Sequence, residues 1–144
     1  YKGVDLTRKF IEGAKIDFPE AEWEVQNAQE LKEDDESWDT VLLYHVLDLC
    51  PDWEKAVEEA LRVAKKRVII NFWHGYTDYD VKLITKYATD REYDYLEEEN
   101  SNWISKKEIE TFMEKHGFPK KPESTIKIFP NTYHYFILDK NGKD

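Results

Sequence analysis

Residues 38–49, WDTVLLYHVLDL, form the most apolar stretch of the chain. Their branched and aromatic side chains predict a strand that is buried on both faces, as in a parallel sheet. Residues 52–66 then repeat apolar side chains at the spacing of a helix with one face on that sheet. The next residues, 67–73 (RVIINFW), predict a second buried strand. This strand–helix–strand order indicates an α/β fold with a largely parallel sheet.

The segment before this stretch predicts a strand, a helix and an outer strand. Residues 1–6 read as a strand that ends in an acidic residue. Thr7 is a candidate N-cap for a helix that Pro19 ends. Residues 22–26 (EWEVQ) alternate polar and apolar side chains, as an outer strand does. The acidic stretch KEDDES, at 32–37, predicts a solvated loop.

The segment after the second buried strand predicts two further helices. Apolar side chains at helical spacing indicate one helix over 77–88. Residues 90–102 are acidic and tyrosine-bearing, which predicts a loop or a lid. Ser105 and Glu108 form a capping box for the next helix, and Gly117 ends it where left-handed geometry is needed.

The last part of the chain predicts an antiparallel hairpin. Residues 124–129 (STIKIF) and 133–138 (YHYFIL) read as strands, and only three residues connect them. A connection this short joins antiparallel neighbours. His134, between two tyrosines, is expected on the outer face of this hairpin.

The composition limits the partners of the protein. With 21 Lys and Arg against 31 Asp and Glu, the net charge is −10, which disfavours a nucleic-acid partner. The single cysteine, Cys50, excludes an internal disulfide and a cysteine-based metal site, and we expect no metal. No apolar run approaches the ~20 residues of a membrane span, and we expect no secretory signal. We therefore expect a cytoplasmic protein without a membrane partner.

The order of elements resembles a class I S-adenosylmethionine-dependent methyltransferase of the small-molecule, methyltransferase type 11-like kind, entered at its second strand. The Rossmann-like sheet of that family has the strand order 3-2-1-4-5-7-6, with the seventh strand antiparallel. Residues 37–49 (SWDTVLLYHVLDL) resemble its strand-four motif, in which Asp39 takes the place of an acid. Residues 58–70 (EEALRVAKKRVII) resemble its helix exit and fifth strand. Two departures are Leu49, where members often carry a histidine, and residues 64–66, which replace a proline-glycine turn.

The resemblance implies that S-adenosylmethionine is the cofactor. Asp5, with Leu6, matches the end of the second strand, where an acid binds the ribose hydroxyls. Asn27 and Ala28 match the segment that cradles adenine. The family prefers aspartate at the first of these two positions, but the Asn27 carbonyl can still accept from the adenine amino group. Tyr44 falls at the strand end that faces the cofactor.

The resemblance also implies methyl transfer to a small-molecule acceptor, for which the family has no universal catalytic residue. A general base is needed only if the acceptor must lose a proton. His45 and His74 are the candidates, since imidazole titrates near neutral pH. His45 is also explained as a hydrogen-bonded core residue. Trp73 could form a wall of the substrate pocket, or it could simply pack in the core.

Tyr93 and Tyr95 are candidate substrate-binding residues within the acidic segment. Their aromatic rings and the surrounding negative charge would suit a cationic or amine acceptor. A merely solvated loop explains the same residues.

The chain, taken as one domain over 1–144, lacks the first strand of the family and its glycine-rich loop. In the family this strand is central, between the second and the fourth. The expectation is an N-terminally truncated domain, and two alternatives remain. Another chain, such as the partner in a homodimer, could donate the strand, or the second and fourth strands could pair directly.

Two other functions remain open. The missing glycine loop and the departures at Asn27 and Leu49 are consistent with a catalytically inactive, methyltransferase-like module that binds a protein partner. An NAD-dependent oxidoreductase would share the ribose-binding acid, but it does not account for the closing hairpin.

Overall fold

The computed structural model describes residues 1–72, 104–128 and 131–140. Near the N-terminus, β1 (Lys2–Asp5) and β2 (Glu22–Val25) form a parallel pair. Both strands were expected, and in this two-stranded sheet each of them is an edge strand.

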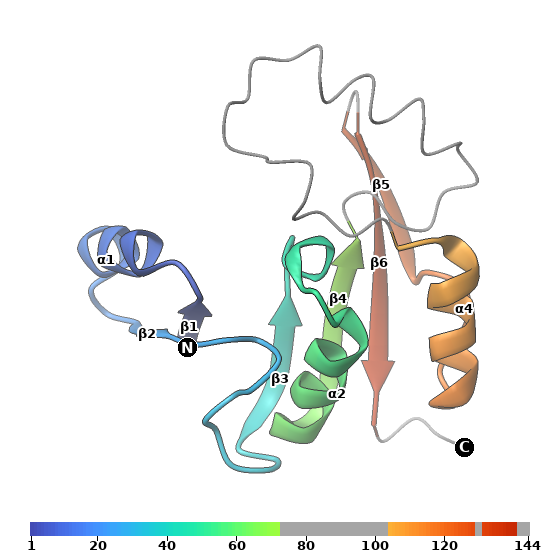
Figure 1. Ribbon diagram of the computed structural model, residues 1–144, viewed down its shortest axis with the longest axis horizontal. Coiled ribbons are helices and arrows are strands. Elements are labelled where there is room, and N and C mark those ends of the chain that lie inside the picture. Colours follow the sequence, from blue (N-terminus) through green and yellow to red (C-terminus); the bar gives the residue numbers. More distant parts are fainter. Residues whose placement is uncertain (73–103, 129–130, 141–144) are drawn as a thin grey trace.

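The other described strands form a second sheet in the order β3-β4-β6-β5 (Figure 1). Its members are β3 (Trp38–Leu43), β4 (Ala64–Phe72), β5 (Ser124–Ile128) and β6 (Asn131–Asp139). The β3 and β4 strands are parallel, whereas β6 is antiparallel to both β4 and β5. This topology confirms the predicted α/β fold, with its parallel pairs and its antiparallel C-terminal hairpin.

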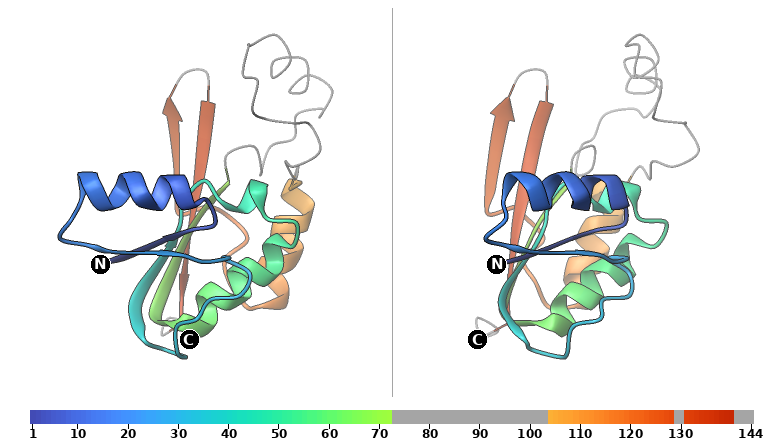
Figure 2. Two further views of the ribbon diagram at one scale, coloured as in Figure 1. Left: turned by 60° about the vertical axis from the view of Figure 1, so that its left-hand side comes forward. Right: turned by 90° about the vertical axis from the view of Figure 1, so that its left-hand side faces the viewer.

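Helices cover the two sheets differently. The α1 helix (Arg8–Asp17) lies against the β1–β2 pair. The α2 helix (Trp53–Val63) and the α4 helix (Lys106–Lys115) both pack on one face of the four-stranded sheet (Figure 2). A short 3₁₀ helix, η1 (Leu47–Leu49), follows β3.

The apolar core lies between the four-stranded sheet and these two helices. Trp53 of α2 meets Phe72 of β4 and Phe112 of α4, with ring centroids 5.7 and 5.1 Å apart. Phe72 also meets Phe136 of β6 edge to face, at 5.9 Å. All four rings are buried, so α2, α4 and the sheet share one tightly packed aromatic centre.

The prediction for residues 38–49 was partly wrong. The strand ends at Leu43 and is not buried on both faces, because Leu42 is 58% exposed. Leu43 points into the core under the helices, whereas Leu42 points to the opposite face, which no described helix covers. The apolar run therefore combines a strand with one open face and the short η1 helix.

The junction between α2 and β4 contains no separate turn. The last helical residue is Val63, and Ala64 is both the C-cap of α2 and the first residue of β4. In place of the proline-glycine turn of the family, the chain therefore passes from the helix directly into the strand.

The predicted capping box is present at the start of α4. The Glu108 N–H donates to Ser105 Oγ at 3.2 Å, and the Ser105 N–H donates to Glu108 Oε2 at 2.7 Å. Gly117 follows the helix with φ +73°, as expected for a left-handed C-terminal residue. The α1 helix differs, since Thr7 is its N-cap without a side-chain hydrogen bond.

The expectation for His134 was wrong. His134 alternates along β6 with Phe136 and Leu138, so it lies on the helix-covered face of the sheet. Burial there lowers the pKa of its imidazole.

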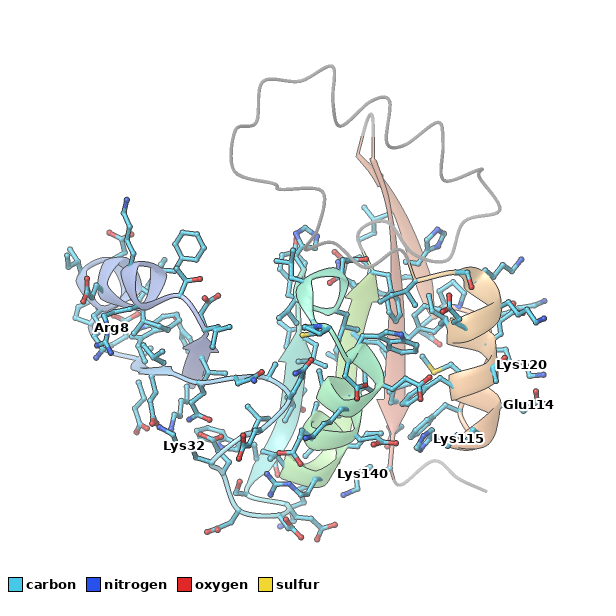
Figure 3. The ribbon with its side chains drawn as sticks, viewed as in Figure 1. Arg8, Lys32, Glu114, Lys115, Lys120 and Lys140 are labelled. Carbon is cyan, nitrogen blue, oxygen red and sulfur yellow. The ribbon has the colours of Figure 1, made fainter. Side chains whose placement is uncertain are left out.

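Polar contacts attach the loop after β2 to α2 and to the end of β6. Arg62 Nη1 donates to the Glu33 carbonyl and to Asp35 Oδ1, both at 2.8 Å, and Nη2 donates to the Leu31 carbonyl at 3.0 Å. At the lower end of the four-stranded sheet (Figure 3), Lys140 Nζ donates to Glu36 and to the Ala64 carbonyl. The acidic loop is therefore held in place by cations rather than simply solvated.

Among the described strands, none lies between β1 and β3, and these two are not hydrogen-bonded to each other. Direct pairing of the two, one of the expected alternatives, is therefore wrong. Each has one edge without a strand partner in the described part of the chain. None of the described helices is long and apolar enough to cross a membrane.

Candidate functional site

Asp5 is the last residue of β1, directly before the turn into α1. Its Oδ1 accepts a hydrogen bond from the Thr7 N–H at 2.6 Å, which fixes the carboxylate at the beginning of the helix. The second oxygen, Oδ2, takes no part in that bond. A half-buried carboxylate held in this way suits a pair of hydroxyl donors such as those of a ribose. Leu6 follows with 71% of its surface exposed.

Asn27 and Ala28 lie in a tight turn after β2. The Asn27 carbonyl oxygens are used by this turn, because Oδ1 accepts from the Gln29 N–H and the backbone oxygen accepts from the Glu30 N–H, each at 3.0 Å. The Asp52 N–H donates to Gln29 Oε1 at 2.8 Å, so the turn is tied to the start of α2. Ala28 packs against the main core. An adenine amino group would have to use the remaining lone pair of an Asn27 oxygen.

Tyr44 and His45 follow the end of β3, and their rings are stacked. The ring centroids are 4.1 Å apart and the planes differ by 14°. Tyr44 is 54% exposed, whereas His45 is half-buried. The pair therefore presents an aromatic surface at the carboxyl end of β3, next to the carboxyl end of β4.

The environment of His45 favours the neutral imidazole. Burial lowers its pKa, and the nearby carboxylate of Asp48 opposes this effect without reversing it. Asp48 belongs to η1 and is only 2% exposed. A neutral imidazole is the form that can accept a proton.

The remaining predicted site residues lie outside the described residues. They are Trp73, His74, Tyr93 and Tyr95, together with the predicted helix over 77–88 and the acidic segment 90–102. Asp39 is described, but it lies at the other end of β3 from Tyr44. Its carboxylate pairs with Lys66 Nζ at 2.7 Å, and this partner lowers its pKa.

Asn71 of β4 was not predicted as a site residue. Its Oδ1 accepts a hydrogen bond from the His45 N–H at 2.9 Å, and the residue is fully buried. The signal in the sequence was a single polar residue inside the apolar run 67–73. A buried amide in such a run needs a partner, and the exit of the neighbouring strand supplies one.

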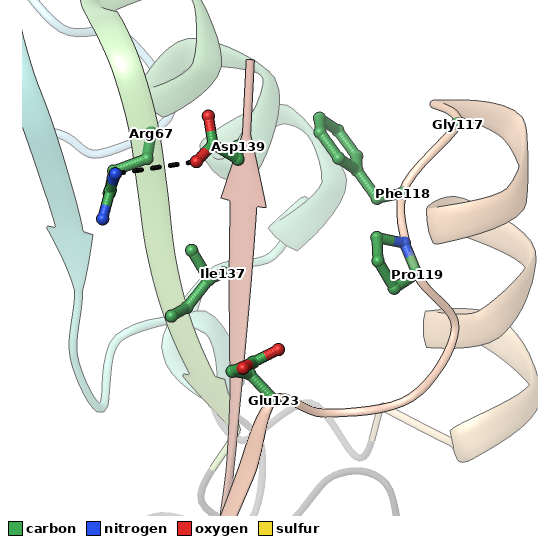
Figure 4. A pocket seen from close by; sticks show the side chains of 7 residues that line it. All are labelled: Arg67, Gly117, Phe118, Pro119, Glu123, Ile137 and Asp139. Carbon is green, nitrogen blue, oxygen red and sulfur yellow. Dashed lines mark ion pairs between the residues drawn. The ribbon is translucent and has the colours of Figure 1, made fainter. Parts of the chain in front are cut away.

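A cavity of about 360 Å³ lies toward the other end of the four-stranded sheet (Figure 4). Its charged residues are Arg67, Glu123 and Asp139, and Arg67 pairs with Asp139 at 3.6 Å. Arg67 lies near the start of β4, whereas Asn71 lies near its end. This cavity is therefore separate from the residues considered above.

The sequence of this protein matches a known protein family. A family model described as "Methyltransferase domain" matches residues 1–72. The chain belongs to this methyltransferase family. The match confirms the resemblance to class I S-adenosylmethionine-dependent methyltransferases, whose cofactor is S-adenosylmethionine. No curated protein matches the sequence.

Solved methyltransferase structures share the fold. A possible histamine N-methyltransferase from Thermotoga maritima superposes with a TM-score of 0.68 at 21% identity, over 96% of this chain and 72% of that one. Magnesium protoporphyrin IX methyltransferase from Synechocystis PCC 6803, with bound SAH, gives 0.69 at 14%, over 96% of this chain and 63% of that one. A methyltransferase from Methanosarcina mazei has a TM-score of 0.67 at 17% identity, over 96% of this chain and 81% of that one. At these identities the likeness concerns the fold alone, and the chain spans only part of each relative.

Proposed function

We propose that this protein transfers a methyl group from S-adenosylmethionine to a small-molecule acceptor. One observation supports the proposal: within a methyltransferase domain, a hydrogen bond holds the carboxylate of Asp5 at the junction of β1 and α1, where the resemblance leads us to expect the ribose-binding acid. The structural relative with bound SAH supports the same cofactor class. When bound, S-adenosylmethionine supplies an electrophilic methyl group on a sulfonium centre.

In this proposal the two parts of the site have different tasks. Asp5 binds the ribose hydroxyls, and the turn at Asn27 and Ala28 lies beside the adenine. Tyr44 covers the cofactor at the end of β3. His45, neutral near physiological pH, accepts a proton if the acceptor is a hydroxyl or a protonated amine. Methyl transfer is an in-line displacement, so positioning and the exclusion of water are the main contributions of the protein.

The proposal needs a further strand between β1 and β3. Both strands have an edge without a strand partner among the described residues, and a buried strand edge without hydrogen bonds is costly. A strand from other residues of the protein, or from a second chain, would satisfy both edges and bring a cofactor-binding loop to the site. Native mass spectrometry of the whole protein separates the two sources: a monomer favours the first, and a dimer favours the second.

Calorimetry with S-adenosylhomocysteine on the whole protein tests the function. The wild type should bind, and Asp5→Asn should bind at least about tenfold more weakly, because the charge-assisted bonds to the ribose are lost. Asparagine keeps an oxygen for the Thr7 N–H, so the β1–α1 turn is preserved. Asp17→Asn, at the exposed end of α1, is the matched control and should bind as the wild type does.

Absence of binding by the wild type at millimolar ligand would contradict the proposal. That result would favour the alternative function, a catalytically inactive methyltransferase-like module that binds another protein. Equal affinity of the Asp5→Asn variant and the wild type would retain the cofactor but remove Asp5 from its site.

A further inference from the structure

The backbone of His45 is unusual for its residue type. Its φ is +53°, in the left-handed region that side chains other than glycine seldom occupy. Glu36, the other described residue of this kind apart from glycine, lies in an exposed loop, whereas His45 is half-buried between β3 and η1. A conformation of this kind persists when the surrounding structure imposes it, and it is frequent at functional sites.

Asn71 supplies a contact that holds this conformation. The last backbone pair of the β3–β4 ladder joins Leu43 to Ile70. Beyond that pair the chain leaves the ladder, and the side-chain oxygen of Asn71 accepts the His45 N–H at 2.9 Å in place of a strand partner. The buried amide thus extends the attachment of β3 to β4 by a side-chain bond.

The other half of the Asn71 amide indicates that packing does not explain this residue. Asn71 is fully buried, and its Nδ2 has no hydrogen-bond partner in the part of the chain that the structure describes. A buried donor without a partner is unfavourable, so a leucine of similar size would suit this buried position better. The bond to His45 gives a reason for an amide at this position.

The stacking of His45 on Tyr44 transmits this constraint to the candidate site. Because the ring centroids are only 4.1 Å apart and the rings nearly parallel, fixing the His45 backbone also limits the position of Tyr44. We infer that Asn71 is a positioning residue. By accepting the hydrogen bond from the His45 N–H, it fixes the position of the stacked Tyr44 and His45 rings at the carboxyl end of β3. The inference rests on the proposed function in one respect: a contribution of Asn71 to methyl transfer requires that Tyr44 and His45 belong to the active site.

Amide hydrogen exchange of His45 tests the inference without any ligand. In the wild type this N–H should be protected, although it lies beyond the end of β3. Asn71→Leu removes the acceptor at similar volume and should reduce the protection about tenfold or more. Asn71→Asp retains an acceptor oxygen, so the His45 N–H should keep most of its protection in this variant. Amides in the middle of β4, such as that of Val68, report whether the sheet itself is intact.

Binding of S-adenosylhomocysteine provides the second measurement. If Tyr44 contacts the cofactor as proposed, Asn71→Leu should weaken binding several-fold, and Asn71→Asp should weaken it less. Loss of His45 protection in Asn71→Leu, with no binding by any variant or by the wild type, would support the positioning role and contradict the proposed function.

Two results would overturn the inference. One is a wild-type His45 amide that exchanges as fast as an exposed one, a measurement that requires no variant to fold. The other is unchanged His45 protection in a folded Asn71→Leu variant, which would show that the rest of the structure imposes the left-handed backbone.

Discussion

The two sheets of this protein are stabilised by different interactions. All members of the buried apolar cluster lie at or after Leu43, in the four-stranded sheet, η1 with its C-cap Cys50, α2, α4 and the segments flanking α4. In the unit formed by β1, α1 and β2, the buried apolar side chain is Ile11, and Phe10 is 66% exposed. That unit is held by Trp23 and by an ion-pair network around Lys2.

This difference divides the candidate site. Tyr44 and His45 directly follow β3 of the sheet with the large core, and the hydrogen bond from the His45 N–H to Asn71 joins them to β4. Asp5 belongs to the unit with little apolar burial, whose β1 edge has no strand partner among the described residues. We infer that the side of the candidate site formed by Tyr44 and His45 is rigid and that the side formed by Asp5 depends more on its polar contacts.

The largest expected effect comes from the core of the four-stranded sheet. Phe112→Ala should lower the free energy of unfolding by about 3–5 kcal/mol, because it empties a fully enclosed site beside Trp53. Phe10→Ala, at an exposed position of α1, should change it by less than about 0.5 kcal/mol. Urea denaturation of the two variants measures the contrast. Similar losses would show that the two regions do not differ as described.

A smaller effect is expected from Gly3 in β1. A Cβ at this position would stand 2.1 Å from Trp23 Cζ3, so Gly3→Ala should displace the indole and cost about 1–3 kcal/mol. The matched control is Gly13→Ala in α1, where a Cβ would meet nothing within 4 Å. This substitution should leave the free energy of unfolding unchanged or raise it. Amide exchange should show that Gly3→Ala lowers the protection of β1 and β2 while β4 keeps its own. Equal losses in both sheets would mean that they unfold as one unit.

The smallest effect concerns the charges of the β1–β2 unit. Lys2 Nζ lies 2.7 Å from Glu24 and 2.8 Å from Glu33, and hydrogen bonds from Lys2 and Lys32 lower the pKa of Glu24 to about 2. A folded pKa below the ordinary value of 4.5 means that the stabilisation is complete above that pH and is lost as the pH falls toward 2. Protection factors in β1 and β2 should therefore decline over this range.

Glu24→Gln provides the control for this titration. The variant should have lower protection in β1 and β2 at neutral pH and a weaker dependence on pH below 4.5. An acid profile identical to that of the wild type would show that Glu24 does not contribute to the stability of this unit.

Much of the fold could be predicted from the sequence because its local signals agree with one another. The capping box at Ser105, the glycine after α4 and the short hairpin connection each specify one geometry. The extent of β3 could not be predicted in the same way. An apolar run does not show whether a covering layer exists on the second face, and here Leu42 is exposed.

The candidate site was predicted only as far as its residues follow directly after strands. Asp5 and Tyr44 were proposed in this way, and the structure places Asp5 at the end of β1 and Tyr44 directly after β3. Asn71 was missed because its hydrogen bond is to His45, which is 26 residues away in the sequence. The expectation that the Asn27 carbonyl accepts from the adenine amino group did not include the turn, in which the two Asn27 oxygens each accept a hydrogen bond.

The α2 helix passes directly into β4 at Ala64, with no loop residue between helix and strand. The pairing of β4 with β3 is irregular between Ala64 and Arg67 but regular from Arg67 to Ile70, so one residue inserted after Arg67 would turn Ile70 and Phe72 away from the helices and Asn71 toward them. Length variation among relatives should therefore avoid residues 67–72 and collect in surface loops, which makes this stretch a fixed reference when their sequences are aligned.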